Sequence, residues 1–496
     1  MISTHLLILQ VVIPLIAAPL CIFLRKPALV WYLVLLVSWI SFYIACQLLA
    51  LVITHSSISY DLGGWAAPWG IEYRLDILNA FVLLLVTSIS AVVIIFARES
   101  IQKEIAEDRI YLFYASYLLN LAGLLGVAVT GDVFNLFVFI EISSLSSYAM
   151  ISLGSEKRAL LAAFRYLILG TIGATFILIG VGLLYAITGT LNMSDLSYRM
   201  QYLDQSRTVI TALAFLTVGI CLKFALFPLH SWLPNAYTYA PSVVSTFLAS
   251  TTTKVFIYVL LRFLFSIFDT TLVFDVMGLH YVLMVCAILA IFSGTITAIY
   301  QTDVKRLLAY SSIAQIGYMV LGISLVSVTG LLAGIVHLFN HALMKSALFM
   351  SMGCVFYRIG SVQLSDLQGL GRSMPWTMAA FVAAGLSLVG IPLTAGFISK
   401  WYLIQASLEQ DMWWLAVAIL ISSLLAIIYV WKVVEVAYFK SQTDTESAEP
   451  PIKEAPAIML VPLWILIIAN LYFGINTELT VDLAHLAAET LLEGGQ

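Results

Sequence analysis

Residues 77–97 read Ile77-Leu-Asn-Ala-Phe-Val-Leu-Leu-Leu-Val-Thr-Ser-Ile-Ser-Ala-Val-Val-Ile-Ile-Phe-Ala97, a run without a charged side chain. A helix needs about 20 mainly apolar residues to cross the hydrocarbon core of a bilayer, so this run predicts a transmembrane helix. Similar runs recur from Leu6 to Phe473. Over the 496 residues, 62% are hydrophobic and 10% are charged, whereas soluble domains carry about 25% charged residues. The sequence therefore excludes a water-soluble fold and predicts an all-α polytopic membrane protein.

About fourteen runs are long enough to span a membrane by this rule. Their approximate bounds are 5–24, 29–53, 77–97, 110–130, 133–153, 161–188, 208–228, 241–267, 279–300, 305–327, 330–357, 376–408, 412–438 and 456–476. Two polar connections, His55 to Asp76 and Thr190 to Arg207, are long enough to hold local structure and contain turn-forming Gly or Asn residues. We expect one continuous membrane domain embedded in the lipid bilayer.

The composition also limits the chemistry. No long polar block interrupts the apolar runs, so the chain contains no soluble catalytic module. The five cysteines stand far apart in apolar segments, without the spacing of a metal or haem site. We therefore expect no cofactor and no metal, and nothing in the sequence supports binding of nucleic acid.

Basic residues in the short loops predict the orientation, because loops rich in Lys and Arg tend to remain in the cytoplasm. One alternating set of loops holds Arg25, Lys26, Arg98, Lys103, Arg109, Lys157, Arg158, Lys305, Arg306, Arg358, Arg372, Lys440 and Lys453. The other set holds only Arg74, Arg199 and Arg207. An even number of spans then places both termini outside.

Seven ionisable residues lie well inside the apolar runs rather than in the loops. They are Glu141, Lys223, Lys254, His337, His341, Lys345 and Lys400. A charge at the bilayer centre costs from a few to more than about ten kcal/mol, and is retained mainly where it faces protein or a water-filled path. These residues therefore predict a path for protons at mid-membrane depth.

Glu141 needs a cationic partner, and Lys223 and Lys254 offer two at comparable depth on other helices. Ser144 and Ser147 follow Glu141 on the same helix and can line a hydrated face. One interpretation is a buried structural ion pair that holds the bundle together. Buried pairs are weak sources of stability, whereas ionisable groups inside a membrane usually serve function, so the sequence favours proton transfer.

His337, His341 and Lys345 recur every four residues, which places them on one face of a helix about 6 Å apart in rise. That spacing suits a proton wire. Two histidines at this spacing can also bind zinc, but the hydrolase motif needs a Glu beside the first His, where Leu338 stands. Zinc also needs further ligands, which favours proton transfer over metal binding.

Two spans carry interruptions centred on proline. One contains Pro228 and His230 shortly after Lys223, and the other contains Pro392 shortly before Lys400. Proline frees a helical carbonyl, which is tolerated in lipid only beside protein or a polar cavity. Paired discontinuous helices indicate inverted repeats with the ion site at the breaks. We expect an N-terminal three-helix segment (1–109), two five-helix repeats (110–267 and 268–440) and a C-terminal helix and tail (441–496).

Three segments resemble the antiporter-like proton-translocating membrane subunits. They are Thr130-Gly-Asp-Val-Phe-Asn-Leu-Phe-Val-Phe-Ile-Glu141, Lys223-Phe-Ala-Leu-Phe-Pro-Leu-His-Ser-Trp-Leu-Pro234 and Asp303-Val-Lys-Arg-Leu-Leu-Ala-Tyr-Ser-Ser312. The resemblance covers nearly the whole chain. Together with Thr188-Gly-Thr-Leu-Asn-Met193, the first segment is most similar to the D-type subunit of Mrp sodium/proton antiporters.

The resemblance implies that Glu141 and Lys223 form the acid and lysine pair of this family, that Lys254 and the histidines relay charge, and that Lys400 ends the path. It implies an ion-transporter subunit of a bacterial cytoplasmic membrane, acting on H+ and Na+ with other membrane subunits as partners, and not an enzyme. The segment around Pro228 also occurs in relatives from complex I and membrane-bound hydrogenases, so a redox-driven proton pump is the alternative. A stand-alone solute carrier is disfavoured, because the charged groups are spread over several helices rather than gathered at one pocket.

Overall fold

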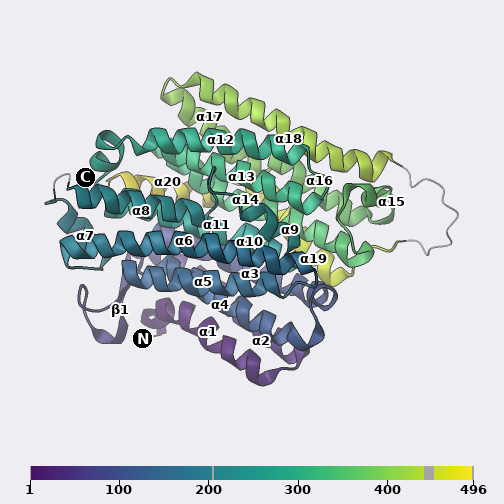
Figure 1. The fold of residues 1–496 in the computed structure, drawn as a ribbon, viewed down its shortest axis with the longest axis horizontal. Coiled ribbons are helices and arrows are strands. Elements are labelled where there is room, and N and C mark those ends of the chain that lie inside the picture. Colours follow the sequence, from purple (N-terminus) through teal and green to yellow (C-terminus); the bar gives the residue numbers. More distant parts are fainter. Residues whose placement is uncertain (1, 204–205, 441–451, 494–496) are drawn as a thin grey trace.

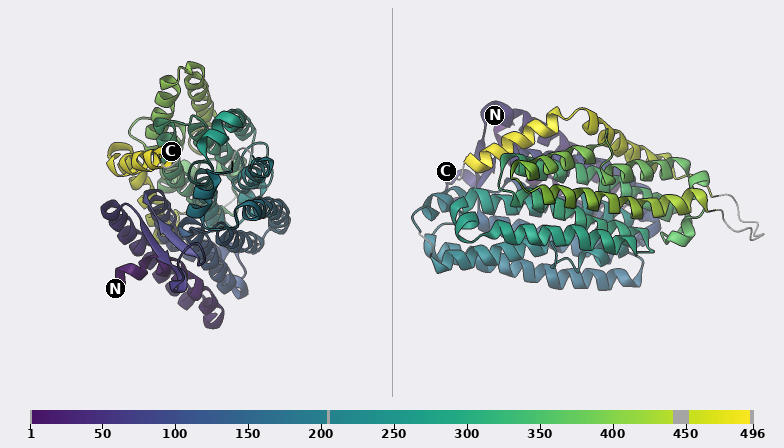
Figure 2. Two further views of the ribbon diagram at one scale, coloured as in Figure 1. Left: turned by 90° about the vertical axis from the view of Figure 1, so that its left-hand side faces the viewer. Right: turned by 90° about the horizontal axis from the view of Figure 1, so that it is seen from above.

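The computed structural model describes residues 2–203, 206–440 and 452–493. Within these residues, 12 helices are long and apolar enough to cross a membrane. They are α1 (Ile2–Leu24), α2 (Pro27–His55), α3 (Ile77–Glu104), α4 (Ile110–Val129), α5 (Val133–Ser152), α6 (Lys157–Thr188), the kinked pair α10 (Ser242–Ser250) and α11 (Thr252–Leu261), α12 (Leu279–Ile299), α13 (Val304–Ser324), α14 (Val328–Ile359), α18 (Trp413–Phe439) and α19 (Ala457–Ile475). They lie side by side in one bundle (Figures 1 and 2), which confirms the all-α polytopic fold.

The two proline-containing segments are interrupted, as the sequence predicts. In the first, α8 (Arg207–Lys223) ends well before α9 (Leu233–Tyr239) begins. In the second, α16 (Pro375–Val389) ends at a left-handed Gly390, and α17 (Ala395–Glu409) follows. Together with the 12 apolar helices, these two segments coincide in sequence with the predicted spans.

The two long polar connections hold local structure, also as predicted. In the first, β1 (Ile58–Asp61) and β2 (Glu72–Leu75) form an antiparallel hairpin around the short helix η1 (Leu62–Gly64). In the second, α7 (Met193–Met200) begins at Asn192, whose side chain accepts hydrogen bonds from the first turn. Both connections lie at the end of the bundle that also carries the chain termini (Figure 1).

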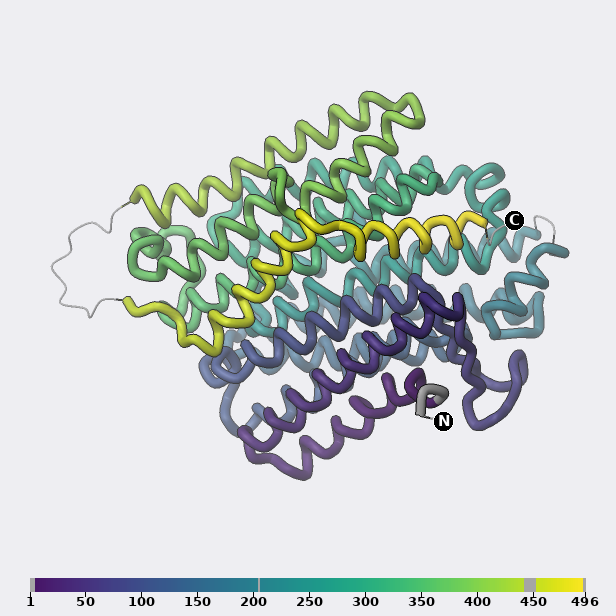
Figure 3. The backbone as a smooth tube through the Cα atoms, turned by 180° about the vertical axis from the view of Figure 1, so that it is seen from behind, coloured from purple at the N-terminus to yellow at the C-terminus, as the bar shows by residue number. Residues whose placement is uncertain are grey.

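The remaining described elements are short, apart from the last helix. They are η2 (Glu107–Arg109), η3 (Arg262–Ile267), η4 (Thr271–Val276), η5 (Leu364–Leu367), α15 (Leu370–Ser373) and α20 (Glu478–Glu493). The sequence interpretation treats the region of α20 as a tail, but α20 packs against α3 and α14 (Figure 3). The predicted boundary at residue 441 lies outside the described residues.

The helix α14 occupies the interior of the bundle. Every residue from Gly330 to Val355 is buried, and α3, α10, α13, α16, α17, α19 and α20 all pack against it. A helix enclosed by other helices is shielded from lipid, so polar side chains on α14 face protein instead of hydrocarbon. This placement explains how a helix carrying two histidines and a lysine is accommodated.

Candidate functional site

The structure brings Glu141 and Lys223 together. Lys223 is the last residue of α8 and is fully buried, and its Nζ lies 3.4 Å from Glu141 Oε1. The same Nζ donates a hydrogen bond to Ser144 Oγ at 2.8 Å. Glu141 and Ser144 lie one turn apart on α5, so this helix presents both acceptors to the ammonium group.

Close packing of α8 on α6 sets the position of Lys223. Gly219 on α8 faces Gly173 on α6, and a Cβ added at Gly219 would lie 2.7 Å from the Gly173 carbonyl oxygen. Only glycine allows the two backbones to approach so closely. Beyond Lys223 the helix stops, and Trp232 Nε1 donates a hydrogen bond to the Leu222 carbonyl at 3.0 Å.

Two of the predicted supporting residues lie apart from this pair. Ser147 accepts a hydrogen bond from Asn120 and donates one to the Ser143 carbonyl, so its hydroxyl is engaged away from Lys223. His230 is half-buried, and its ring stacks on Phe227. Pro228 is exposed within the interruption between α8 and α9. Of the supporting residues near this pair, Ser144 contacts the lysine directly, whereas no hydrogen bond joins Ser147 or His230 to it in the described part of the chain.

His337 and His341 lie one turn apart in the buried interior of α14. His337 forms hydrogen bonds with Ser399 Oγ through Nδ1 at 2.8 Å and with Gln315 Oε1 through Nε2 at 2.9 Å. The ring of His341 is nearly parallel to that of His337, with 6.0 Å between centroids. Neither ring nitrogen of His341 has a hydrogen-bond partner among the described residues. These two nitrogens can therefore bind water or exchange protons.

The same geometry bears on the zinc alternative. Both ring nitrogens of His337 are already engaged by neighbouring side chains. Among the residues that the structure describes, no group of three His, Cys, Asp or Glu side chains is arranged to hold a metal ion. The histidine pair is thus better suited to hydrogen bonding than to metal coordination.

Lys345 and Lys254 donate to main-chain carbonyls. Lys345 Nζ donates to the Leu308 carbonyl at 2.8 Å and to Ser311 Oγ at 2.5 Å, both on α13. Lys254 Nζ donates to the Ala249 carbonyl and to Thr253 Oγ1. The Ala249 carbonyl is available because the helix kinks at Thr251, between α10 and α11.

Lys400 is held at the break between α16 and α17. Its Nζ donates to the carbonyls of Leu388 and Val389, at 3.1 and 2.9 Å, and to Ser423 Oγ at 3.0 Å. These are carbonyls that the end of α16 leaves without a helical partner. Pro392 lies in the break itself and is exposed.

We call the seven ionisable side chains the charged row: Glu141, Lys223, Lys254, His337, His341, Lys345 and Lys400. Lys254 lies close enough for its charge to act on His341 and Lys345, and Lys400 acts in the same way on His337. Lys223 Nζ lies 5.9 Å from the ring of Phe256, which is on the same helix as Lys254. The charged row therefore runs from α5 through α8, α11 and α14 to α17, with α11 between its two halves.

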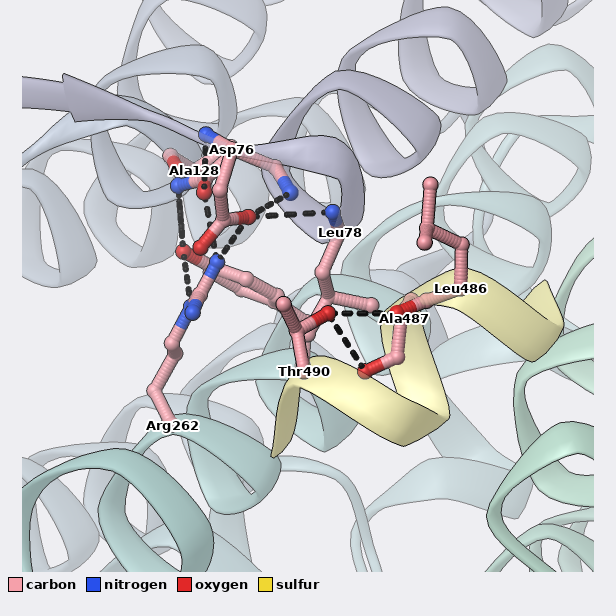
Figure 4. A network of polar contacts seen from close by, with 9 residues as sticks. Asp76, Leu78, Ala128, Arg262, Leu486, Ala487 and Thr490 are labelled. Carbon is pink, nitrogen blue, oxygen red and sulfur yellow. Dashed lines mark hydrogen bonds and ion pairs between the residues drawn. The ribbon is translucent and has the colours of Figure 1, made fainter. Parts of the chain in front are cut away.

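Sequence reasoning missed an ion pair at the end of the bundle near the termini. Arg262 donates to Asp76 Oδ1 and Asn79 Oδ1, each at 2.5 Å, and to Tyr258 Oη at 3.1 Å. Burial alone would raise the pKa of Asp76, but the Arg262 guanidinium and backbone donors hold it below its usual value. Figure 4 shows this network beside α20. The signal available in the sequence was Arg262 itself, a charge inside the predicted span 241–267, but nothing in the sequence identified Asp76 as its partner.

A second missed ion pair lies at the opposite end. Lys305, expected in a loop, is instead the second residue of α13, and its side chain is buried. Its Nζ lies 3.7 Å from Glu104 Oε2, and Glu104 is likewise buried at the end of α3. Charges near the predicted limits of a span were read as loop residues, which hid this contact.

Comparison with known proteins identifies the family to which this chain belongs. Residues 130–426 match the family described as NADH:quinone oxidoreductase/Mrp antiporter, transmembrane. The N-type subunit of the NADH-quinone oxidoreductase of Desulforudis audaxviator is 41% identical, over 96% of this chain and 97% of its own length. The D-type subunit of the Na(+)/H(+) antiporter of Alkalihalophilus pseudofirmus is 34% identical, over 78% of this chain and 77% of its own length.

Two solved membrane complexes contain chains of the same fold. A chain of the Mrp complex from Dietzia sp. DQ12-45-1b superposes with a TM-score of 0.90 at 25% identity, covering 99% of this chain and 98% of that one. A chain of an archaeal membrane-bound sulfane sulfur reductase superposes with a TM-score of 0.91 at 29% identity, with the same coverage. By sequence and by fold, the chain therefore belongs to the NADH:quinone oxidoreductase/Mrp antiporter family of proton-translocating membrane subunits.

Proposed function

We propose that this chain moves H+ along the charged row as a subunit of a multisubunit monovalent cation (Na+)/H+ antiporter. The observation that carries the proposal is the row itself, in which seven ionisable side chains on five helices lie in an apolar bundle, six of them buried. D-type antiporter subunits among the relatives support the assignment, as does the Mrp complex among the solved structures.

The proton begins on Lys223, whose ammonium group is held by the Glu141 carboxylate. When Glu141 and Lys223 separate, the ammonium group loses its main counter-charge and gives its proton to water on the side of Lys254. His341 and His337 pass the proton on, because an imidazole accepts at one nitrogen and donates from the other. Lys400 receives it at the far end, where the carbonyls of α16 hold the new ammonium group.

The helix breaks supply the acceptors for this transfer. A helix end carries roughly half a negative charge on its free carbonyls, which favours a nearby cation. Lys254 and Lys400 each donate to such carbonyls. Each lysine can therefore hold a proton transiently without a carboxylate partner.

The orientation is part of the proposal. We infer that the chain lies in a bacterial cytoplasmic membrane with both termini outside, because the loops rich in Lys and Arg lie at the opposite end of the bundle. The described ends of the chain share one end of the bundle (Figure 1), which agrees with this inference. Other membrane subunits would cover the outer face of α5, where Glu141 keeps 25% of its side chain exposed.

A second candidate is the proton-pumping membrane subunit of a complex I-like or related redox complex. The relative at 41% identity, an N-type subunit of NADH-quinone oxidoreductase, favours it. The charged row would work in the same way in both cases, and only the source of energy would differ. In the antiporter it is an ion gradient, and in the redox complex it is electron transfer in partner subunits.

The two candidates are separated by purifying the tagged chain with its native partners. The complex is reconstituted into liposomes that contain a pH-sensitive dye, and a Na+ gradient is imposed, with choline as the matched control. The antiporter predicts H+ flux opposite to the Na+ gradient and none with choline. Co-purified iron-sulfur subunits, with H+ flux that needs an electron donor and ignores Na+, would refute the antiporter and support the second candidate.

A further inference from the structure

A polar cavity of about 340 Å³ opens at the end of the bundle opposite the termini. Its exposed rim includes Glu156 and Arg158, at the start of α6. Lys305 lines it from the buried side, together with Asp303 and Tyr239. The cavity has room for several water molecules and enough polar groups to hold them. The cavity therefore offers water from this surface a route as far as Lys305.

Glu104 lies just beyond Lys305. A smaller hollow, which shares Glu156, Tyr239 and Lys305 with the cavity, is lined by Glu104 itself. The carboxylate accepts hydrogen bonds from Ser100 Oγ at 2.8 Å, and from the Ser242 backbone NH and Oγ at 2.8 and 3.1 Å. Lys305 stands 3.7 Å away and also donates to the Ala240 carbonyl. Glu104 thus contacts the wall of the cavity on one side and the first residue of α10 on the other.

From Ser242, a line of hydroxyl groups follows α10 into the bundle. Ser242, Thr246 and Ser250 are spaced four residues apart, about 6 Å per step, and all are buried. At the inner end, Ser346 Oγ on α14 donates to Ser250 Oγ at 2.7 Å. Ser346 follows Lys345 in the chain. Ser250 directly precedes the kink at which Lys254 is held, so the line ends within one helical turn, along the chain, of two lysines of the charged row.

Polar groups thus follow one another from the surface toward the middle of the charged row. Thr246 Oγ1 and Ser250 Oγ each donate to the carbonyl one turn earlier in α10, at 2.8 and 2.7 Å, so water bridges the steps between successive hydroxyl groups. A purely structural ion pair would account for the contact of Glu104 with Lys305. It would not account for a polar cavity with room for several water molecules on one side of that pair and a buried hydroxyl line on the other. A carboxylate between the two is the group best suited to take up a proton and release it again, since it cycles between its acid and its anion.

We propose that Glu104 is the carboxylate at which protons enter the bundle from this end, and that water bound along the α10 hydroxyl line passes them on toward Lys254 and Lys345. In the first step, hydronium in the cavity protonates the Glu104 carboxylate and becomes water, while Lys305 keeps its hydrogen bond to the Ala240 carbonyl. In the second step, the acid gives its proton to water beside Ser242, and the carboxylate pairs with Lys305 again. The inference rests on the proposed proton transport through the charged row.

The test compares Glu104→Gln with Glu99→Gln in the assembled complex, in the liposome assay described above. Glu99 lies on the same helix and takes part in no ion pair among the described residues. Glu104→Gln should slow H+ flux by about a hundredfold, the lower range for loss of a proton-transfer group. Glu99→Gln should leave it unchanged. Sodium azide, whose conjugate acid is a small proton carrier, should restore flux to Glu104→Gln when added on the side of the cavity.

Restoration by azide separates proton entry from a structural role, because azide cannot repair a misfolded bundle. Wild-type flux in Glu104→Gln, or lost flux that azide does not restore, would overturn the proposal. If Glu104→Gln fails to assemble on a native gel, H+ flux is measured instead in the double variant Thr246→Val and Ser250→Ala, where it should fall. This variant removes hydroxyl groups without removing a charge, and wild-type flux in it would also overturn the proposal.

Glu141→Gln distinguishes this inference from the proposed function. If Glu141→Gln transports normally, the charged row itself is not the path, and the proposed function fails. If Glu141→Gln is inactive while Glu104→Gln is normal, only the proposed entry path fails.

Discussion

The ion pair of Glu141 and Lys223 gives the sharpest test of the proton path, because its strength follows from its geometry. At the 3.4 Å that separates Nζ from Oε1, two unit charges interact by about 5 kcal/mol at an effective dielectric constant of about 20. The side chain of Glu141 is 25% exposed, so solvent screening reduces this to about 2–3 kcal/mol. Without the carboxylate, the buried ammonium form of Lys223 loses this stabilisation, and about 1.4 kcal/mol corresponds to a factor of ten. Lys223 would then be loaded with a proton about a hundred times less often, so Glu141→Gln should reduce H+ flux about a hundredfold.

Two further variants separate charge from packing. Glu141→Asp keeps the charge but withdraws it by about 1.5 Å, one carbon–carbon bond, and should retain part of the flux. The exchange Glu141→Lys with Lys223→Glu preserves an ion pair but inverts the order of acid and base. A structural pair would tolerate the exchange, whereas a proton path would not, because the lysine would then lie on the wrong side of the pair.

The measurement is H+ flux in liposomes, normalised to assembled complex on a native gel. Glu435→Gln is the matched control, since Glu435 pairs with Lys440 at an exposed position of α18. Flux at the wild-type level in Glu141→Gln would refute the role of the pair. Full activity of the exchanged pair, or Glu141→Asp as slow as Glu141→Gln, would show that the charge of residue 141 is not what matters.

Three further predictions concern other members of the charged row and the terminal ion pair. Lys400→Met should abolish H+ flux. Lys432→Met is the control and should leave the flux unchanged, although Lys432 also donates to main-chain carbonyls, those of Ile299 and Gln301. Equal losses of flux in the two variants would show that Lys400 acts through packing and not through proton transfer. His341→Phe keeps the ring volume but removes both nitrogens, and should lower flux at least about tenfold; unchanged flux would remove His341 from the path. Asp76→Asn should lower the melting temperature of the complex while sparing flux, because it leaves Arg262 without its counter-charge. The stabilisation by Asp76 exists above the ordinary Asp pKa of about 3.9 and disappears as pH falls through its lower folded value, so the wild type and Asp76→Asn should melt alike only in acid.

The sequence predicted the elements that depend on local composition. Apolar length alone located the spanning helices, because lipid permits little else across its core. Pro228 and Pro392 located two helix interruptions, since proline cannot donate a helical hydrogen bond. The charges of Glu141 and Lys223 stood out against an apolar background, and the structure brings them within 3.4 Å.

The kink at Thr251 could not be predicted in the same way, because neither proline nor glycine marks it. A weaker sign of the kink in the sequence is the run from Ser250 to Thr253, because its hydroxyl groups compete for main-chain carbonyls. The pairs formed by Asp76 with Arg262 and by Glu104 with Lys305 were also missed. In each pair the partners are more than 180 residues apart in the chain, and a single sequence carries no information about which distant ends of helices meet.

The number of carboxylates in the charged row suggests where transport is controlled. Lys254, Lys345 and Lys400 donate to carbonyl and hydroxyl oxygens, whereas Lys223 is the one lysine of the row with a carboxylate partner among the described residues. When a lysine beside a carbonyl loses its proton, only a neutral dipole remains without a partner. When a lysine beside a carboxylate loses its proton, a buried anion remains without a counter-charge, which costs more free energy. Release is therefore held back at Lys223, and a carboxylate placed beside another lysine should create a second point of control.

Thr253→Asp tests this reasoning at Lys254, whose Nζ lies 3.3 Å from Thr253 Oγ1. An added carboxylate at that distance would interact with the ammonium by up to about 5 kcal/mol at an effective dielectric constant of about 20, and should slow H+ flux at least tenfold. Thr253→Asn has nearly the same shape without the charge, and should transport at close to the wild-type rate. If both variants are equally slow, the side chain acts by its shape. If Thr253→Asp transports freely, a carboxylate does not hold the proton, and Glu141 cannot be the point of control for that reason.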